Sequence, residues 1–247
     1  MLQHDENIGQ VLKKLDDLGI ADNTIVIYST DNGPEHESYP HGATTPYRSD
    51  KMTTWEGGVR VPMLVRWPGR IAPGTDLNGI QCQEDVFTTL AAAAGVPDVK
   101  ERLAKGDDFG TGVVKRNYID GFNNLDYWTG KTDKSARNFV IFYAESHLQA
   151  VRFGPWKVHF DVRNGYYGST EKLEIAWLFN IRQDPFESYD QAPGPRAGLS
   201  QSHTYLQYLV TDVITEHVKS LMAYPPVQKG TSLSFDQILQ AIPKGTQ

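Results

Sequence analysis

Two side chains with oxygen donors, Asp31 and Asn32, directly follow an uncharged run at 24–30 in the stretch TIVIYSTDNG. A carboxylate and an amide carbonyl are hard oxygen ligands of the kind that calcium and magnesium bind in proteins. The Asp-Asn-Gly sequence is also common turn chemistry, because Asp caps turns and Asn tolerates the left-handed conformation. On these residues alone, both interpretations stay open.

The segment SDKMTTWEGG places Lys51 in a loop that ends in Gly57 and Gly58. A lysine in such a loop can bind an oxyanion as a compact positive charge, although most lysines are simply solvated at the surface. His36 and His41 lie in the same long loop, where each can bind a ligand, donate a proton or only meet solvent. These three residues are candidates for substrate binding on their type alone.

The single cysteine, Cys82, excludes an intrachain disulfide and a metal cluster held by several thiolates. We expect its side chain to pack as a small apolar group. The sequence contains no serine-centred nucleophile elbow, no phosphate-binding glycine loop and no histidine pair at zinc spacing. The common nucleophile and zinc motifs are therefore excluded.

Two predicted elements position the Asp-Asn pair. Apolar residues recur at three- and four-residue spacing from Ile8 to Leu18, which predicts an amphipathic helix. The β-branched and aromatic run at 24–28 predicts a central strand covered on both faces. In an open α/β sheet the carboxyl ends of strands face the ligand-binding crevice, so Asp31 and Asn32 stand where such folds bind ligands.

The remaining chain predicts further α/β elements and then an antiparallel meander. The loop 33–58 is long enough to be functional. A strand at 59–67 is expected at an edge or with an irregularity because it contains Pro62, and a helix is expected at 84–94. Four closely spaced β-type runs and a late amphipathic helix follow: Asn138–Ala144, Leu148–Gly154, Trp156–Asp161, Ala176–Ile181 and His203–Ala223.

These elements predict an α/β fold class. It consists of part of a mixed sheet with flanking helices, followed by a smaller α+β domain with an antiparallel sheet and a C-terminal helix. The composition becomes polar and glycine-rich at 98–135, which indicates a boundary. We therefore expect one domain at 1–115 and a second at 116–247.

Charge and composition restrict the partners. The net charge is -6 and no Lys/Arg-rich run occurs, which argues against nucleic acid or an anionic membrane surface as a partner. No apolar run approaches transmembrane length. The first ten residues lack the basic and apolar regions of a signal peptide. The cellular compartment stays open.

Several segments together resemble the C-terminal half of the sulfatase family, within the alkaline-phosphatase-like superfamily. They extend in the family's order from Leu15 to Glu187: LDDLGIADNTIVIYSTDNG, KMTTWEGGVRVPMLVRWPGRI, QEDVFTTLAAAAG, LQAVRFGPWKV and LFNIRQDPFE. The combination is specific, although no single piece is. The resemblance covers most of the chain.

The resemblance implies a role for each matching residue. Asp31 and Asn32 match the Asp-Asn pair that coordinates the calcium holding the sulfate ester. Lys51 matches the lysine of the K-x-T-T-x-E-G-G segment, which contacts the sulfate. A divalent ion and a cation beside a sulfate stabilise the charge that builds on its oxygens in the transition state. His36 and His41 have no counterpart in the pattern and remain candidates for substrate contact.

The chain departs from the family at the nucleophile. Sulfatases use a cysteine, oxidised to formylglycine, in a C-x-P/A-x-R setting. Cys82 is followed by Gln-Glu-Asp-Val at 83–86, with neither the Pro/Ala nor the Arg, so it is not the nucleophile. The family's nucleophile and further acidic metal ligands belong to an N-terminal half, which we expect to be missing before Met1.

The function that follows is a sulfatase-like chain for sulfuric ester hydrolysis, which supplies calcium and sulfate ligands and is inactive alone. The expected substrate is the sulfate ester of a small molecule or carbohydrate. A separate N-terminal half, or self-association, would complete the fold. Two alternatives stay open: a non-catalytic binding module on the sulfatase fold, and part of a phosphodiester or phosphonate-ester hydrolase of the same superfamily.

Overall fold

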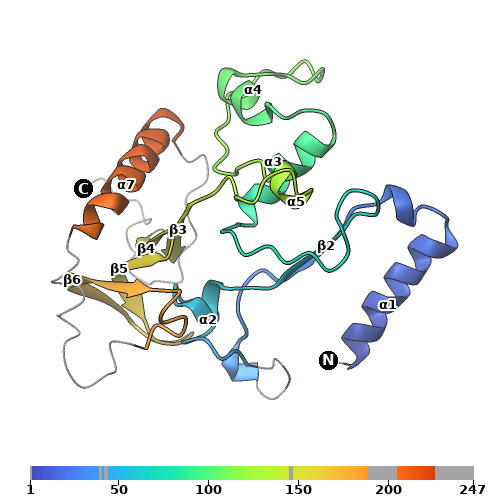
Figure 1. Ribbon diagram of the computed structural model, residues 1–247. Coiled ribbons are helices and arrows are strands. Elements are labelled where there is room, and N and C mark those ends of the chain that lie inside the picture. Colours follow the sequence, from blue (N-terminus) through green and yellow to red (C-terminus); the bar gives the residue numbers. More distant parts are fainter. Residues whose placement is uncertain (1, 39–40, 42–43, 145–146, 189–204, 226–247) are drawn as a thin grey trace, which may run out of the picture. The chain divides into compact units, whose positions relative to one another are not determined.

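A computed structural model describes residues 2–38, 41, 44–144, 147–188 and 205–225 (Figure 1). The chain forms two compact units, one from 1–46 with 58–139 and the other from 47–57 with 140–247. The segment 47–57, which carries Lys51, therefore belongs to the unit formed by the C-terminal part of the chain. The expected domains 1–115 and 116–247 stay a prediction.

The first unit begins with α1, Leu2–Asp17, which confirms the predicted N-terminal helix. None of its residues is buried, and the half-buried ones are Ile8, Leu12 and Leu15 on the predicted apolar stripe. A short 3-10 turn, Ala21–Asn23, leads from this helix to the first strand.

The first strand, β1 (Val26–Ser29), pairs antiparallel with β2 (Met63–Arg66) in a two-stranded sheet. The prediction that the run at 24–28 is covered on both faces is wrong for the described residues. Tyr28 is exposed and the rest of the strand is only half-buried, because a two-stranded sheet offers little cover. The second strand is also shorter than the predicted 59–67, since Val59 ends the short helix α2, Glu56–Val59.

Three helices follow in the first unit: α3 (Glu84–Ala93), α4 (Val99–Lys105) and α5 (Leu125–Trp128). The first confirms the predicted helix at 84–94. The other two lie in the polar stretch at 98–135, where no helix was predicted. None of the described helices has the length and apolar character needed to cross a membrane.

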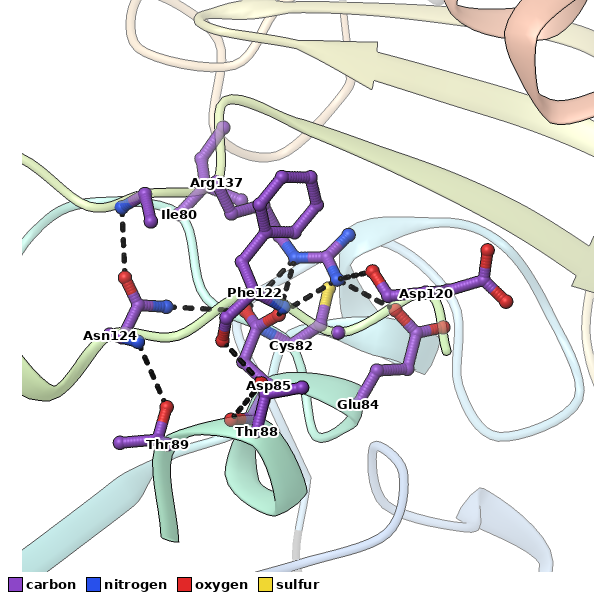
Figure 2. A network of polar contacts seen from close by, with 12 residues as sticks. Ile80, Cys82, Glu84, Asp85, Thr88, Thr89, Asp120, Phe122, Asn124 and Arg137 are labelled. Atoms are coloured by element: carbon purple, nitrogen blue, oxygen red, sulfur yellow. Dashed lines mark hydrogen bonds and ion pairs between the residues drawn. The ribbon is translucent and has the colours of Figure 1, made fainter. Parts of the chain in front are cut away.

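A buried ion pair between Arg137 and Asp85 joins the start of α3 to later segments of the first unit (Figure 2). The Arg137 Nε donates to both Asp85 carboxylate oxygens at 3.0 and 2.9 Å, and its Nη2 donates to Asp85 Oδ1 at 2.8 Å. Asp85 also accepts the backbone N–H of Cys82 and of Phe122, at 2.9 and 2.7 Å. This Arg137 cluster fixes the start of α3 to the segment 120–124, to which Arg137 donates at the Asp120 carbonyl (3.1 Å).

The second unit contains a four-stranded antiparallel sheet in the order β3-β4-β5-β6, as the meander prediction requires. Its strands are β3 (Phe139–Ala144), β4 (His147–Phe153), β5 (Trp156–Arg163) and β6 (Thr170–Asn180). Helix α7, Leu206–Ala223, packs along the sheet (Figure 1). Residues 203–204 of the predicted helix lie outside the described residues.

Two hydrophobic clusters occupy the second unit. One contains Val151, Val158 and Leu178 of the sheet together with Val210 of α7. The other gathers Val162, Phe179 and Ile181 around the fully buried Trp55. Side chains alternate along a strand, so neighbours such as Leu178 and Phe179 enter different clusters. The segment 47–57 thus contributes its own aromatic side chain to the core of this unit.

Candidate active site

The structure places Asp31 and Asn32 just beyond the end of β1, as the sequence predicts. Asp31 is exposed and Asn32 is half-buried. The Thr30 hydroxyl donates to Asp31 Oδ1 and to the Asn32 carbonyl, each at 3.3 Å. The next residue, Gly33, donates its backbone N–H to the Gly58 carbonyl at 2.9 Å. The turn therefore leaves the Asp31 carboxylate accessible to a ligand.

The oxygen donors of this pair fit part of the shell of a hard cation. Calcium takes six to eight oxygen ligands, and one carboxylate with one amide supplies a minority of them. Within the described ranges, no group of three or more His, Cys, Asp or Glu side chains could hold a metal ion. The calcium role of Asp31 and Asn32 stays a prediction.

The two loop histidines are exposed. His36 begins a 3-10 turn, His36–Ser38, and His41 donates its backbone N–H to the Ser38 carbonyl at 2.8 Å. Their proposed contact with substrate stays a prediction.

Lys51 lies in a segment with unusual backbone geometry. Ser49 and Met52, on either side of it, have φ angles of 64° and 69°, in the left-handed region that non-glycine residues rarely adopt. The Lys51 ammonium lies 5.9 Å from the ring centroid of Tyr166, and the side chain is half-buried. Each such residue costs on the order of 1–3 kcal/mol and persists only where surrounding contacts hold it.

Those contacts come from both sides of Lys51. Asp50 is buried, and its carbonyl accepts the Thr53 hydroxyl at 2.7 Å. Trp55 donates its indole N–H to the Arg163 carbonyl at 3.0 Å. Arg48 stacks on the Trp55 ring with its guanidinium carbon 3.7 Å from the centroid. The segment 47–57 is therefore held firmly to the sheet of its own unit.

Gly57 closes the segment 47–57, here called the Lys51 loop, because no other residue fits there. Its N–H donates to the Arg48 carbonyl at 2.8 Å. A Cβ at this position would lie 2.3 Å from the backbone oxygens of Arg48 and Ser49. The glycine of the E-G-G sequence thus permits the two ends of the Lys51 loop to meet.

Glu56 at the end of the loop belongs to a buried group of ionisable side chains, Glu56, Lys157, His159 and Glu187, here called the Glu187 cluster. All four are at most 1% exposed. Lys157 Nζ lies 3.0 Å from Glu56 Oε1 and 3.1 Å from Glu187 Oε1, and His159 Nε2 lies 2.7 Å from Glu187 Oε1. One ammonium between two carboxylates compensates much of the cost of burying them.

The cluster shifts two pKa values. Burial alone would raise the pKa of Glu187, but Lys157 and His159 outweigh it and lower the pKa to about 2. Burial lowers the pKa of His159, so its ring is neutral near pH 7 and its Nε2–H donates to Glu187. Glu187 is therefore a carboxylate that accepts hydrogen bonds throughout the usual pH range.

The sequence predicts Asp31, Asn32 and Lys51 as candidate ligands, but it does not reveal the buried residues that hold the Lys51 loop. From the segments GPWKV and DPFE alone, Lys157 and Glu187 are expected to be exposed charged residues, although both are fully buried. The alternation of residues along β5 indicates this burial, since Lys157 and His159 share one face of a strand whose other face is apolar. Ionisable residues at alternate positions of a central strand indicate a buried polar cluster.

Comparisons with known proteins show which family the sequence and the fold resemble. The family model for sulfatase matches residues 1–96, and the model described as the C-terminal region of aryl-sulfatase matches residues 135–246. The two matches lie in the order in which the sequence segments run, with residues 97–134 between them. The chain belongs to the sulfatase family.

Individual sulfatases are similar along most of the chain. The steryl-sulfatase of Rattus norvegicus is 35% identical over 221 residues, covering 77% of this chain and 36% of its own length. Arylsulfatase A of Homo sapiens is 31% identical over 212 residues, covering 78% of this chain and 38% of its own length. The chain thus spans well under half of these curated sulfatases.

The fold agrees as well. The crystal structure of the PsFucS1 sulfatase from Pseudoalteromonas sp. superimposes with a TM-score of 0.73 at 26% identity, covering 92% of this chain and 43% of that one. This confirms the predicted fold class: α/β elements followed by an antiparallel sheet with a C-terminal helix. By family, the chain is related to sulfuric ester hydrolases.

Proposed function

We propose that this sulfatase-family chain supplies cation and sulfate ligands for the hydrolysis of sulfate esters. The observation that carries the proposal is the Lys51 loop, where two residues in the left-handed region flank a lysine and buried contacts hold them there. Strained backbone of this kind is concentrated at functional sites. A solvated surface lysine would require neither the strain nor the anchoring.

Lys51 is the proposed sulfate ligand. Its ammonium donates hydrogen bonds to the sulfate oxygens and stabilises the negative charge that develops as the ester bond breaks. A lysine held before the substrate arrives does not have to be ordered during the reaction, which is the advantage of a preorganised site.

Asp31 and Asn32 are the proposed metal ligands, for which their exposed position and oxygen donors are suited. A bound calcium ion would polarise the sulfate ester as a Lewis acid. His36 and His41 are proposed to contact the remainder of the substrate, the sulfate ester of a small molecule or carbohydrate.

The nucleophile is proposed to come from outside these residues. The 247-residue sequence contains no C-x-P/A-x-R motif, and covalent catalysis does not begin without an activated nucleophile. A separate N-terminal half is the proposed partner that supplies it, and self-association is the proposed alternative cover for β1, since Tyr28 is exposed there.

Hydrolysis of an aryl sulfate tests this function. The chain is assayed with calcium, alone and together with a sulfatase N-terminal segment that carries the nucleophile, against an aryl phosphodiester as the competing substrate. We expect no turnover by the chain alone, and sulfate-ester turnover by the combination that falls by about a hundredfold or more in Lys51→Ala. Turnover by the chain alone, or a preference for the phosphodiester, would contradict the proposal.

A further inference from the structure

Glu187 accepts hydrogen bonds from two residues of the Lys51 loop in addition to its contacts within the core. Its Oε2 accepts the backbone N–H of Glu56 at 2.5 Å, and its own carbonyl accepts Arg48 Nη1 at 2.9 Å. Glu56 and Arg48 lie on either side of Lys51 along the chain. One residue from the turn after β6 therefore holds both ends of the Lys51 loop.

The same residue is tied to the sheet by its other carboxylate oxygen. Oε1 accepts His159 Nε2–H at 2.7 Å and lies 3.1 Å from Lys157 Nζ. Both partners are on β5 and both are fully buried. Glu187 thus connects strand β5 to the backbone of the Lys51 loop, because Oε1 contacts the strand and Oε2 accepts the loop's Glu56 N–H.

The backbone of Glu187 is itself in the left-handed region, with a φ of 51°. Outside the Lys51 loop, only one other described non-glycine residue, Phe109, has a positive φ. Strain is therefore concentrated in the loop and in the residue that holds it. A carboxylate needed only to neutralise Lys157 would not require this conformation, because Glu56 already lies 3.0 Å from that ammonium.

We propose that Glu187 is a positioning residue that fixes the Lys51 loop, and through it the Lys51 ammonium, for binding to a sulfate group. The inference rests on the proposed function, in which Lys51 contacts sulfate. Glu187 acts through Lys51 and does not itself meet the substrate, since it is fully buried.

The test measures sulfate binding and loop order separately in the full chain. Sodium sulfate is titrated against protein carrying ¹³C-labelled lysine, with sodium chloride at equal ionic strength as the control. The Lys51 signal is the one missing from Lys51→Ala. Amide hydrogen exchange is followed at Glu56 and Gly57, whose N–H groups donate to Glu187 and Arg48.

In Glu187→Gln we expect the dissociation constant for sulfate to rise by about tenfold, because sulfate must then order a loop and a lysine that are no longer held in place. Exchange at Glu56 and Gly57 should quicken by at least about tenfold, because the local opening of the loop becomes easier. Glu174→Gln, an exposed glutamate on β6, should change neither quantity.

A second control separates positioning from general destabilisation. Leu178→Ala removes a side chain from the cluster under α7, not the one around Trp55. It should lower the unfolding temperature but leave sulfate affinity within about twofold, measured well below that temperature. If Leu178→Ala weakens sulfate binding as much as Glu187→Gln does, Glu187 is only structural and the inference is wrong.

The remaining outcomes distinguish the two proposals. A Lys51 signal that responds to sulfate equally in Glu187→Gln and in the unaltered chain overturns the positioning role and leaves the proposed function standing. A Lys51 signal that ignores sulfate in the unaltered chain overturns both. If Glu187→Gln does not fold, Arg48→Lys removes the other anchor of the loop and is expected to weaken sulfate binding in the same direction.

Discussion

The Arg137 cluster of one unit and the Glu187 cluster of the other are built from the same kind of contact and differ in what they hold. Arg137 joins the start of α3 to the segment 120–124, and neither Arg137 nor Asp85 has a positive φ (Figure 2). Glu187 joins a strand to a loop in which Ser49 and Met52 are strained. A buried charge network around relaxed backbone fixes elements, whereas one around strained backbone indicates a candidate site.

The largest effect on the free energy of unfolding is expected for the Arg137 cluster, which joins structural elements and supports no candidate ligand. Arg137→Ala leaves Asp85 buried without its cation, so the free energy of unfolding should fall by about 3–5 kcal/mol. Urea denaturation measures this change. Lys131→Ala, which removes a largely exposed ion pair with Asp126, is the control and should have little effect. A loss below about 1 kcal/mol in Arg137→Ala would show that the cluster is not stabilising.

The Glu187 cluster should make the chain sensitive to acid. Burial lowers the pKa of His159 from its ordinary 6.5, so below about pH 6.5 the unfolded chain binds a proton that the folded chain does not. The pKa of Glu187 is lowered from 4.5 to about 2, despite burial, by Lys157 and His159, and this contributes roughly 3 kcal/mol above pH 4.5. That contribution is lost progressively as the pH falls from 4.5 to 2.

Urea denaturation between pH 7 and pH 3 measures this dependence. The free energy of unfolding should fall with pH, and Glu187→Gln should flatten the part below pH 4.5. Stability that stays constant or rises on acidification would mean that the Glu187 carboxylate is not held ionised by its neighbours.

A smaller effect is expected at the end of β1, where no buried network supports the ligands. Because Asp31 and Asn32 supply few of the oxygens that calcium needs, the chain should bind calcium with a dissociation constant on the order of 1 mM. Asp31→Ala should abolish the binding, and Asp22→Ala, another exposed aspartate, should not. Titration calorimetry that gives submicromolar affinity, or equal affinity in Asp31→Ala, would refute the assignment.

Local sequence patterns predict most of the antiparallel sheet and the helix α3. Three strands of the meander, β3 to β5, and the helix α3 are predicted to within two residues, because apolar alternation and helical periodicity are local features of the sequence. The fourth strand, β6, begins at Thr170, six residues before the predicted start at Ala176. The partial exposure of β1 is not predictable in this way, because an apolar run such as 24–28 does not reveal how many strands pair with it. The helices at 99–105 and 125–128 were missed because short helices carry little periodicity.

The candidate site divides in the same way. Lys51, Asp31 and Asn32 are predicted from their type, their position and a family resemblance. Glu187 lies in the segment DPFE, where no local pattern indicates a role, because its partners Arg48 and Glu56 are more than a hundred positions away in sequence. Contacts over that separation are set by tertiary structure, and no local spacing predicts them.

A double-mutant cycle on sulfate binding tests most directly the claim that Glu187 acts through Lys51. The dissociation constant for sodium sulfate is measured for the unaltered chain, Lys51→Ala, Glu187→Gln and the double variant. If Glu187 only positions Lys51, then Glu187→Gln weakens binding about tenfold in the unaltered chain and has no further effect once Lys51 is removed. Equal, additive losses in both backgrounds would show that Glu187 affects sulfate binding independently of Lys51, and the account would be wrong.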